Sequence, residues 1–95
     1  MFTHIVFFKF TDKSSDVVDG LSKLLKSMEG KVDYLRHLEF GVDVRKTERS
    51  YDMALITKFD TLSDLVAYGT HPAHLPVLEF VKQNNIKSNI VDFES

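Results

Sequence analysis

Hydrophobic and polar positions alternate along several short stretches of this chain and recur at helical spacing in longer ones. The first stretch, residues 2–10, reads Phe-Thr-His-Ile-Val-Phe-Phe-Lys-Phe. Its β-branched and aromatic residues are typical of a strand. Both sets of alternate positions are mostly apolar, so this strand needs cover on both of its faces.

Further segments also have strand character. Residues 38–44 place apolar side chains at alternate positions, and Gly41 within them suggests a bulge. Residues 51–59 alternate a more apolar set with a more polar one, and residues 88–93 form the last predicted strand. The polar residues 45–50 between two of these segments predict a loop.

The first helix is predicted from an apolar stripe that follows a serine cap. Ser14 or Ser15 is suited to the N-cap, and Gly30 is suited to the position just beyond the helix. Between them, apolar residues recur at the spacing of one helix face: Val17, Val18, Leu21, Leu24, Leu25 and Met28.

The second helical region is predicted to be interrupted. Thr61 and Asp64 resemble a capping box at its start. The two prolines within residues 70–76 lack a backbone donor and restrict the residue before them, so the helix should break there. Helical spacing resumes at Val77 and continues to residues 84–85.

This element order, β-α-β-β-α-β, predicts an α+β fold, the ferredoxin-like arrangement, in one domain over residues 1–95. Both helical regions then cover one face of an antiparallel sheet. The other face carries Ile5, Phe7, Ala54 and Ile56. An exposed apolar face of this kind marks an interface, so we expect a symmetric homodimer whose open sheet faces pack together.

Composition narrows the classes of function. Hydrophobic residues make up 43% and charged residues 27% of the 95 residues, as in a folded globule. A net charge of −2 argues against nucleic acid as a partner. The lack of cysteine excludes disulfides and thiolate metal sites. No membrane-spanning or signal-like stretch is evident, so we expect a cytoplasmic protein without a membrane partner.

Histidines are the main candidates for chemistry. His4 shares its strand face with Phe8, and a buried histidine needs partners for both ring nitrogens or leaves one facing a cavity. His71 and His74 bracket the helix break, where the alternative is that one caps a turn and the other starts a helix. Their spacing differs from the i, i+4 pair of a helical metal site, so we expect no metal. His37 is expected to be solvated.

A pocket is predicted where the second helical region breaks. If the helix pauses after Tyr68, then Tyr68 and His74 both point into the space between helix and sheet; alternatively, Tyr68 packs on the sheet with its hydroxyl at the rim. Apolar walls with a few convergent polar groups are typical of small-molecule sites. No glycine-rich phosphate loop or nucleophile elbow occurs, so we expect no cofactor.

Three segments together resemble one family. They are F-T-H-I-V-F-F-K-F, Y-D-M-A-L-I-T-K-F and A-Y-G-T-H-P-A-H-L-P-V-L-E-F. They are similar to the stress-responsive dimeric A/B barrel domain, called Dabb, over essentially the whole chain. The resemblance implies ferredoxin-like protomers whose sheets close into a dimeric α+β barrel. Most members of that family have no settled biochemical role.

The resemblance also implies roles for individual residues. One plant member is a polyketide cyclase that works without metal or cofactor. By that similarity, His74 is the general base, Tyr68 binds the substrate's carbonyl oxygen and His4 supports the pocket. Met53 stands where the cyclase has a further pocket histidine, which makes this pocket more apolar.

Three hypotheses follow, and the sequence leaves open whether the protein is an enzyme. The first is a homodimer that binds a small apolar or aromatic molecule. The second is a cofactor-independent cyclase or lyase with His74 as general base. The third is a structural, stress-protective dimer without a ligand. For the first two, the predicted site residues are His4, Phe8, Met53, Tyr68, His71 and His74.

Overall fold

The computed structural model describes residues 1–95 and contains four strands and three helices. In chain order these are β1 (Phe2–Lys9), α1 (Ser15–Ser27), β2 (Leu35–Val42), β3 (Met53–Phe59), α2 (Leu62–Tyr68), α3 (Leu75–Gln83) and β4 (Lys87–Glu94). The predicted ferredoxin-like βαββαβ order is confirmed, with the second helical region divided into α2 and α3. None of the helices combines the length and apolar content that a membrane crossing requires.

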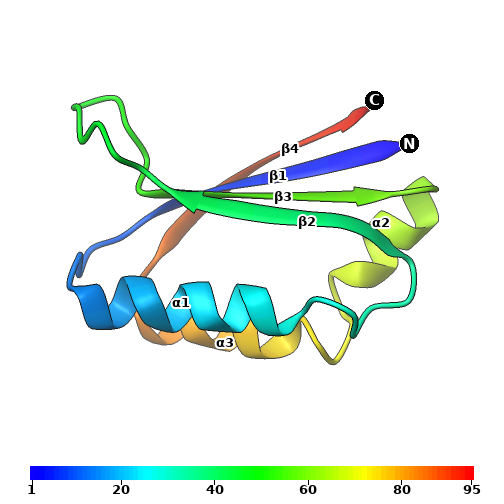
Figure 1. Ribbon diagram of the computed structural model, residues 1–95, viewed down its shortest axis with the longest axis horizontal. Coiled ribbons are helices and arrows are strands. Elements are labelled where there is room, and N and C mark those ends of the chain that lie inside the picture. Colours follow the sequence, from blue (N-terminus) through cyan, green and yellow to red (C-terminus); the bar gives the residue numbers. More distant parts are fainter.

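The strands form one antiparallel sheet in the order β2-β3-β1-β4. The first strand is therefore central: Ile5 pairs with Ile56 of β3 on one side and with Val91 of β4 on the other. Figure 1 shows that the helices all lie on one side of this sheet, with α1 and α3 running beneath it. On the helix-covered side of the sheet, β1 contributes Val6 and Phe8 to the core, which accounts for one of its two apolar sets.

Local signals start and stop the helices as predicted. The Ser14 side chain accepts a hydrogen bond from the Val17 amide and caps α1. Gly30 follows α1 with a φ of +75°, a left-handed conformation that glycine adopts without strain. Thr61 accepts a hydrogen bond from the Asp64 amide at 3.1 Å and caps α2.

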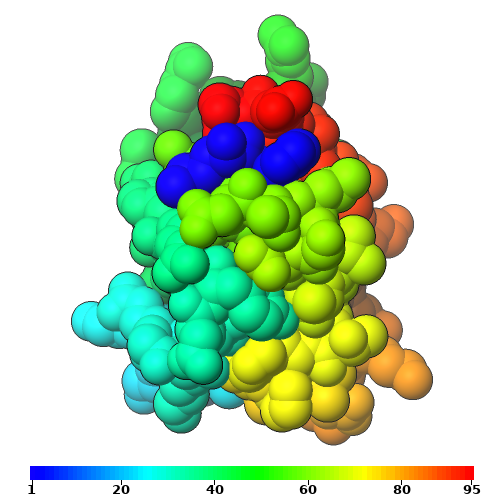
Figure 2. All heavy atoms as spheres, turned by 90° about the vertical axis from the view of Figure 1, so that its right-hand side faces the viewer, coloured from blue at the N-terminus to red at the C-terminus, as the bar shows by residue number.

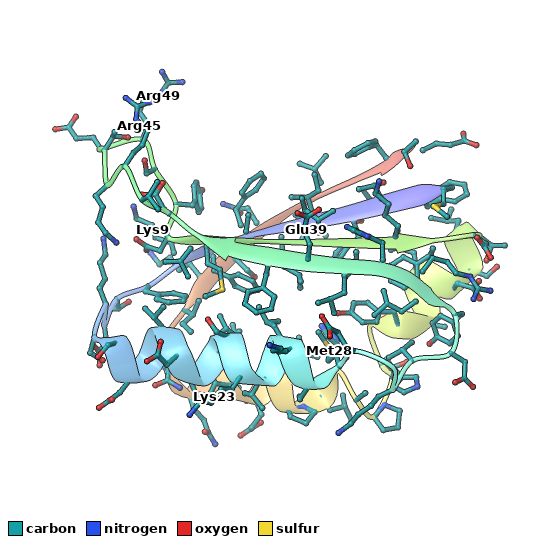
Figure 3. All side chains as sticks on the ribbon, viewed as in Figure 1. Lys9, Lys23, Met28, Glu39, Arg45 and Arg49 are labelled. Carbon is teal, nitrogen blue, oxygen red and sulfur yellow. The ribbon has the colours of Figure 1, made fainter.

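Two details differ from the sequence prediction. The irregularity in β2 lies between Leu35 and His37, not at Gly41, which pairs regularly with Ala54. The strand also ends at Val42, two residues before the end of the predicted strand over residues 38–44. The chain turns into a loop after Val42, and Figure 3 shows Arg45 and Arg49 of this loop pointing away from the sheet.

The second proline of the predicted break is also placed differently. Pro76 lies in the first turn of α3 rather than in the interruption. An amide at that position has no partner within the helix, so proline is tolerated there. The interruption itself spans Gly69 to His74.

The core fills the space between the sheet and the helices. Side chains from every helix and from β1 and β3 are buried in it: Val6, Phe8, Phe10, Val17, Leu21, Leu25, Met28, Val32, Met53, Leu55, Phe59, Leu65, Tyr68, Val77 and Ile86. Gly20 lets α1 approach α3 closely, because a Cβ there would lie 2.8 Å from the Phe80 ring. The helices are therefore held as a layer beneath β1 and β3.

The opposite face of the sheet has no helix over it. The register places Ile5 and Phe7 of β1 beside Ile56 and Ala54 of β3 on this face. Val91 and Phe93 of β4 extend it and remain 51% and 44% exposed. This confirms the predicted arrangement of an apolar sheet face that the chain itself does not cover.

Candidate functional site

A cavity of about 330 Å³ lies between the helix-covered face of the sheet and helices α2 and α3. Most of its wall is apolar and includes Val6, Leu55, Leu65, Val77 and Val81. Its polar side chains are His4, Tyr68, His74, Ser88 and Asp92. This volume is at the small end of the range for ligand pockets.

The break between α2 and α3 positions one side of this cavity. After Tyr68, the chain forms a series of tight turns before α3 begins. These turns bring the rings of Tyr68 and His74 together, with their centroids 4.4 Å apart. The predicted pause of the helix, and the prediction that both side chains enter the space between helix and sheet, are confirmed. Figure 2 shows the turn region in yellow below α2, and the two chain ends lie side by side above it.

The hydrogen bonding of His74 defines its tautomer. Its Nδ1 lies 3.2 Å from the carbonyl oxygen of Gly69. Because a carbonyl can only accept, Nδ1 carries the proton, and in the neutral ring Nε2 holds a lone pair. Nε2 has no hydrogen-bond partner within the protein. It is nevertheless accessible, because every polar atom of a buried or half-buried side chain that lacks a partner keeps some exposed surface. Since His74 lines the cavity, we infer that Nε2 is the ring nitrogen available to a ligand there.

The environment of His74 favours its neutral form. Burial lowers the pKa of His74, and the positive charges that His4 and His71 can carry lower it further. The hydrogen bond to Gly69 opposes these effects but does not outweigh them. A neutral imidazole with a free Nε2 is the form that can accept a proton or a hydrogen bond from a ligand.

Tyr68 forms part of the cavity wall and is held by contacts within the core. Its side chain is buried, and its hydroxyl donates to the Met28 sulfur at 3.5 Å; Figure 3 labels Met28 at the end of α1. Burial raises the pKa of Tyr68 well above its usual value. The ring packs 5.2 Å from that of Phe59 and meets His4 edge-on at 6.3 Å. In this geometry Tyr68 supplies a wall of the cavity, and its hydroxyl lies in the core beside Met28 instead of at the rim.

His4 is paired with an acidic residue that the sequence analysis did not identify. Across the β1–β4 ladder His4 lies opposite Asp92, and its Nδ1 donates to Asp92 Oδ1. The side chain of His4 is 13% exposed, whereas that of Asp92 is 34% exposed. The sequence does indicate that Ser88, Ile90 and Asp92 share one face of β4, because they stand at alternate positions of the strand. Only the register with β1 shows which of them meets His4.

The other predicted site residues divide into two groups. Phe8 lines the cavity, whereas His71 and Met53 do not. His71 Nδ1 accepts a hydrogen bond from the Ala73 amide at 3.0 Å, which is the turn-capping alternative. Met53 is 2% exposed and packs in the core beside Phe8.

Outside the cavity, His37 is exposed, as predicted, and its Nε2 lies 3.0 Å from Glu39 Oε1. No three histidine, aspartate or glutamate side chains come together in an arrangement that could hold a metal ion.

The protonation of His74 can be measured directly. We expect NMR titration to give His74 a pKa below the ordinary imidazole value of about 6.5, with the proton of the neutral ring on Nδ1. The unfolded chain then takes up this proton first as the pH falls. The stability that neutral His74 contributes is therefore present above about pH 6.5 and is lost below it. A pKa at or above 6.5, or a proton on Nε2, would contradict this assignment.

Comparisons with known proteins agree with the fold described above. Solved structures that match include a dimeric protein of unknown function with a ferredoxin-like fold from Bacteroides fragilis. That protein is 26% identical, with a TM-score of 0.86 over 99% of this chain and 95% of that chain. A dimeric ferredoxin-like protein of unknown function from Thermobifida fusca is 24% identical, with a TM-score of 0.88 over 99% and 90% of the two chains.

A hydroxynitrile lyase from Passiflora edulis shares the fold at 17% identity, with a TM-score of 0.70 over 99% of this chain and 94% of that chain. A comparison with curated proteins found no match. The family model of the stress responsive A/B barrel domain, Dabb, matches residues 2–95. That match covers nearly the whole chain, including the β1 histidine and the helix break that build the cavity, and the protein therefore belongs to the Dabb family.

Proposed function

We propose that this protein binds a small, mainly apolar molecule in the cavity between the sheet and helices α2 and α3. The observation that carries the proposal is the composition of the cavity wall, which is apolar over most of its area and includes the polar side chains of His4, Asp92 and His74. Burying an apolar surface in such a wall supplies affinity, and a few polar groups orient the ligand.

The mouth of the cavity supports the same proposal. Val66, Leu78 and Ile90 line it and remain exposed to solvent, one on each of α2, α3 and β4. These residues come from three consecutive elements of the chain, which the fold packs around one opening. A bound apolar molecule would cover part of this surface.

A blocked mouth tests the proposal. The probe is N-phenylnaphthylamine, a neutral aromatic dye whose fluorescence rises in apolar sites. We expect Leu78→Trp, at the mouth, to weaken its binding by about tenfold or more, because the indole occupies the opening. The matched control is Leu62→Trp, since Leu62 is an exposed leucine of α2 that does not line the cavity. Equal binding by both variants and the unaltered protein would place the dye elsewhere and overturn the proposal.

A second candidate function is proton abstraction by His74, as in a cofactor-independent lyase or cyclase. The specific observation that favours it is the free Nε2 of a ring whose other nitrogen is held by Gly69. A base of this kind can remove the O–H proton of a hydroxynitrile, so that the C=O bond forms as the bond to cyanide breaks. The lyase from Passiflora edulis suggests this test reaction by its name, and its likeness to this chain shows the fold alone.

Mandelonitrile cleavage provides the measurement for this second candidate. We expect His74→Ala to lower the rate by about a hundredfold or more, which is a typical contribution of a general base. The control is His71→Ala, because His71 lies outside the cavity. The basic form of His74 should persist below pH 6.5, so the rate should decline only below that pH. A rate that survives His74→Ala would exclude this role.

We further propose that two copies associate through the open face of the sheet. This surface carries Ile5, Phe7 and Ile56 at its centre and charged side chains around them, such as Glu39, which Figure 3 shows rising from this side. The relatives from Bacteroides fragilis and Thermobifida fusca are described as dimeric. A dimer without any ligand is the third hypothesis, and it shares this interface.

A charge at the centre of the open face tests the interface. We expect Ile56→Glu to raise the dissociation constant by about a hundredfold or more, because it would bury an unpaired carboxylate. The control is Val44→Glu, since Val44 is 88% exposed in the loop after β2. Sedimentation velocity distinguishes the dimer from the monomer. An unchanged dimer in Ile56→Glu would show that association uses another surface.

A further inference from the structure

Apart from Ser88, the polar side chains of the cavity offer a ligand hydrogen-bond acceptors and no free donor. Nδ1 of His74 donates to the Gly69 carbonyl, so the neutral ring presents only the Nε2 lone pair to the cavity. One Asp92 oxygen is held by His4, and the other makes no hydrogen bond. A carboxylate can only accept. Both residues therefore lack a donor for a ligand.

The remaining groups at this end of the cavity do not change the balance. In its neutral form His4 donates through Nδ1 to Asp92, which leaves Nε2 as another acceptor. The hydroxyl of Tyr68 is already directed at the Met28 sulfur. Ser88 is the lining side chain that can still donate, and it lies opposite Phe8, four residues along β4 from Asp92.

We infer that the cavity selects small apolar molecules that carry a hydrogen-bond donor, such as a phenol or an alcohol, over isosteres that lack one. This inference rests on the proposed ligand-binding function and specifies its ligand class. A ligand hydroxyl can donate a hydrogen bond to His74 Nε2 or to the free Asp92 oxygen. An ether or ketone has only acceptor oxygens and can form no hydrogen bond with either atom. Each buried acceptor left without a donor weakens binding.

Charge adds a second element of selection. A ligand carboxylate would lie near the Asp92 carboxylate, and the repulsion between like charges opposes its binding. The inferred ligand is therefore neutral as well as hydroxylated. Its apolar body packs against side chains such as Val6, Leu55 and Val77, which have no polar atoms to contribute.

Matched aromatic probes test this inference by displacement of N-phenylnaphthylamine at pH 8, where an ordinary imidazole is neutral. The probes are p-ethylphenol, its methyl ether p-ethylanisole, and p-ethylbenzoate. We expect the phenol to bind about tenfold or more tightly than the ether, and the benzoate to bind most weakly. Equal affinity for phenol and ether, or tighter binding of the benzoate, would overturn the inference while leaving the proposed cavity in place. If neither the dye nor any probe binds, the proposed function itself fails.

A near-isosteric variant tests the acceptor directly. Asp92→Asn can keep its oxygen on His4 and turn an N–H group to the cavity, so we expect the preference for phenol over ether to shrink by about tenfold. Asp92 is partly exposed, which makes the change compatible with folding. Asp19→Asn, at an exposed position of α1, is the control. His74→Phe keeps a ring of similar shape without the acceptor and should reduce the same preference. An unchanged preference in both Asp92→Asn and His74→Phe would overturn the inference.

Discussion

The hydrogen bond from His74 Nδ1 to the Gly69 carbonyl is the constraint on which the chemistry of the cavity depends. It forms because the helix stops at Tyr68 and the chain turns before α3 begins. An uninterrupted helix would use the Gly69 carbonyl for its own backbone hydrogen bond. The break therefore leaves the Gly69 carbonyl free to accept a hydrogen bond from His74 Nδ1. This bond fixes the tautomer of His74, so that Nε2 is the unprotonated nitrogen available to a ligand.

The central strand connects the cavity to the open face of the sheet. Successive side chains of β1 point to opposite faces, so His4 enters the cavity while Ile5 lies on the open face. A shift of one residue in register would exchange these roles for the whole strand. Pairing with both β3 and β4 prevents that shift, and it holds His4 opposite Asp92.

Local patterns were sufficient to predict much of this architecture. The serine cap and apolar stripe of α1, the capping threonine of α2 and the alternation in β3 each act over a few residues, and each is found as expected. The helix break and the pairing of Tyr68 with His74 were also predictable, because proline chemistry is local. The bulge was misplaced at Gly41, since glycine permits an irregularity without requiring one.

Spacing along the chain was enough to predict the elements, their order and the apolar face of each strand, because these properties depend on neighbouring residues. The folded arrangement, in contrast, sets which side chains share the cavity. It placed Asp92 opposite His4 through the register of two strands that lie at opposite ends of the chain. It also left His71 in a turn and Met53 in the core, although both were among the predicted site residues. Contacts between distant segments depend on how the layers pack, and no local pattern encodes that packing.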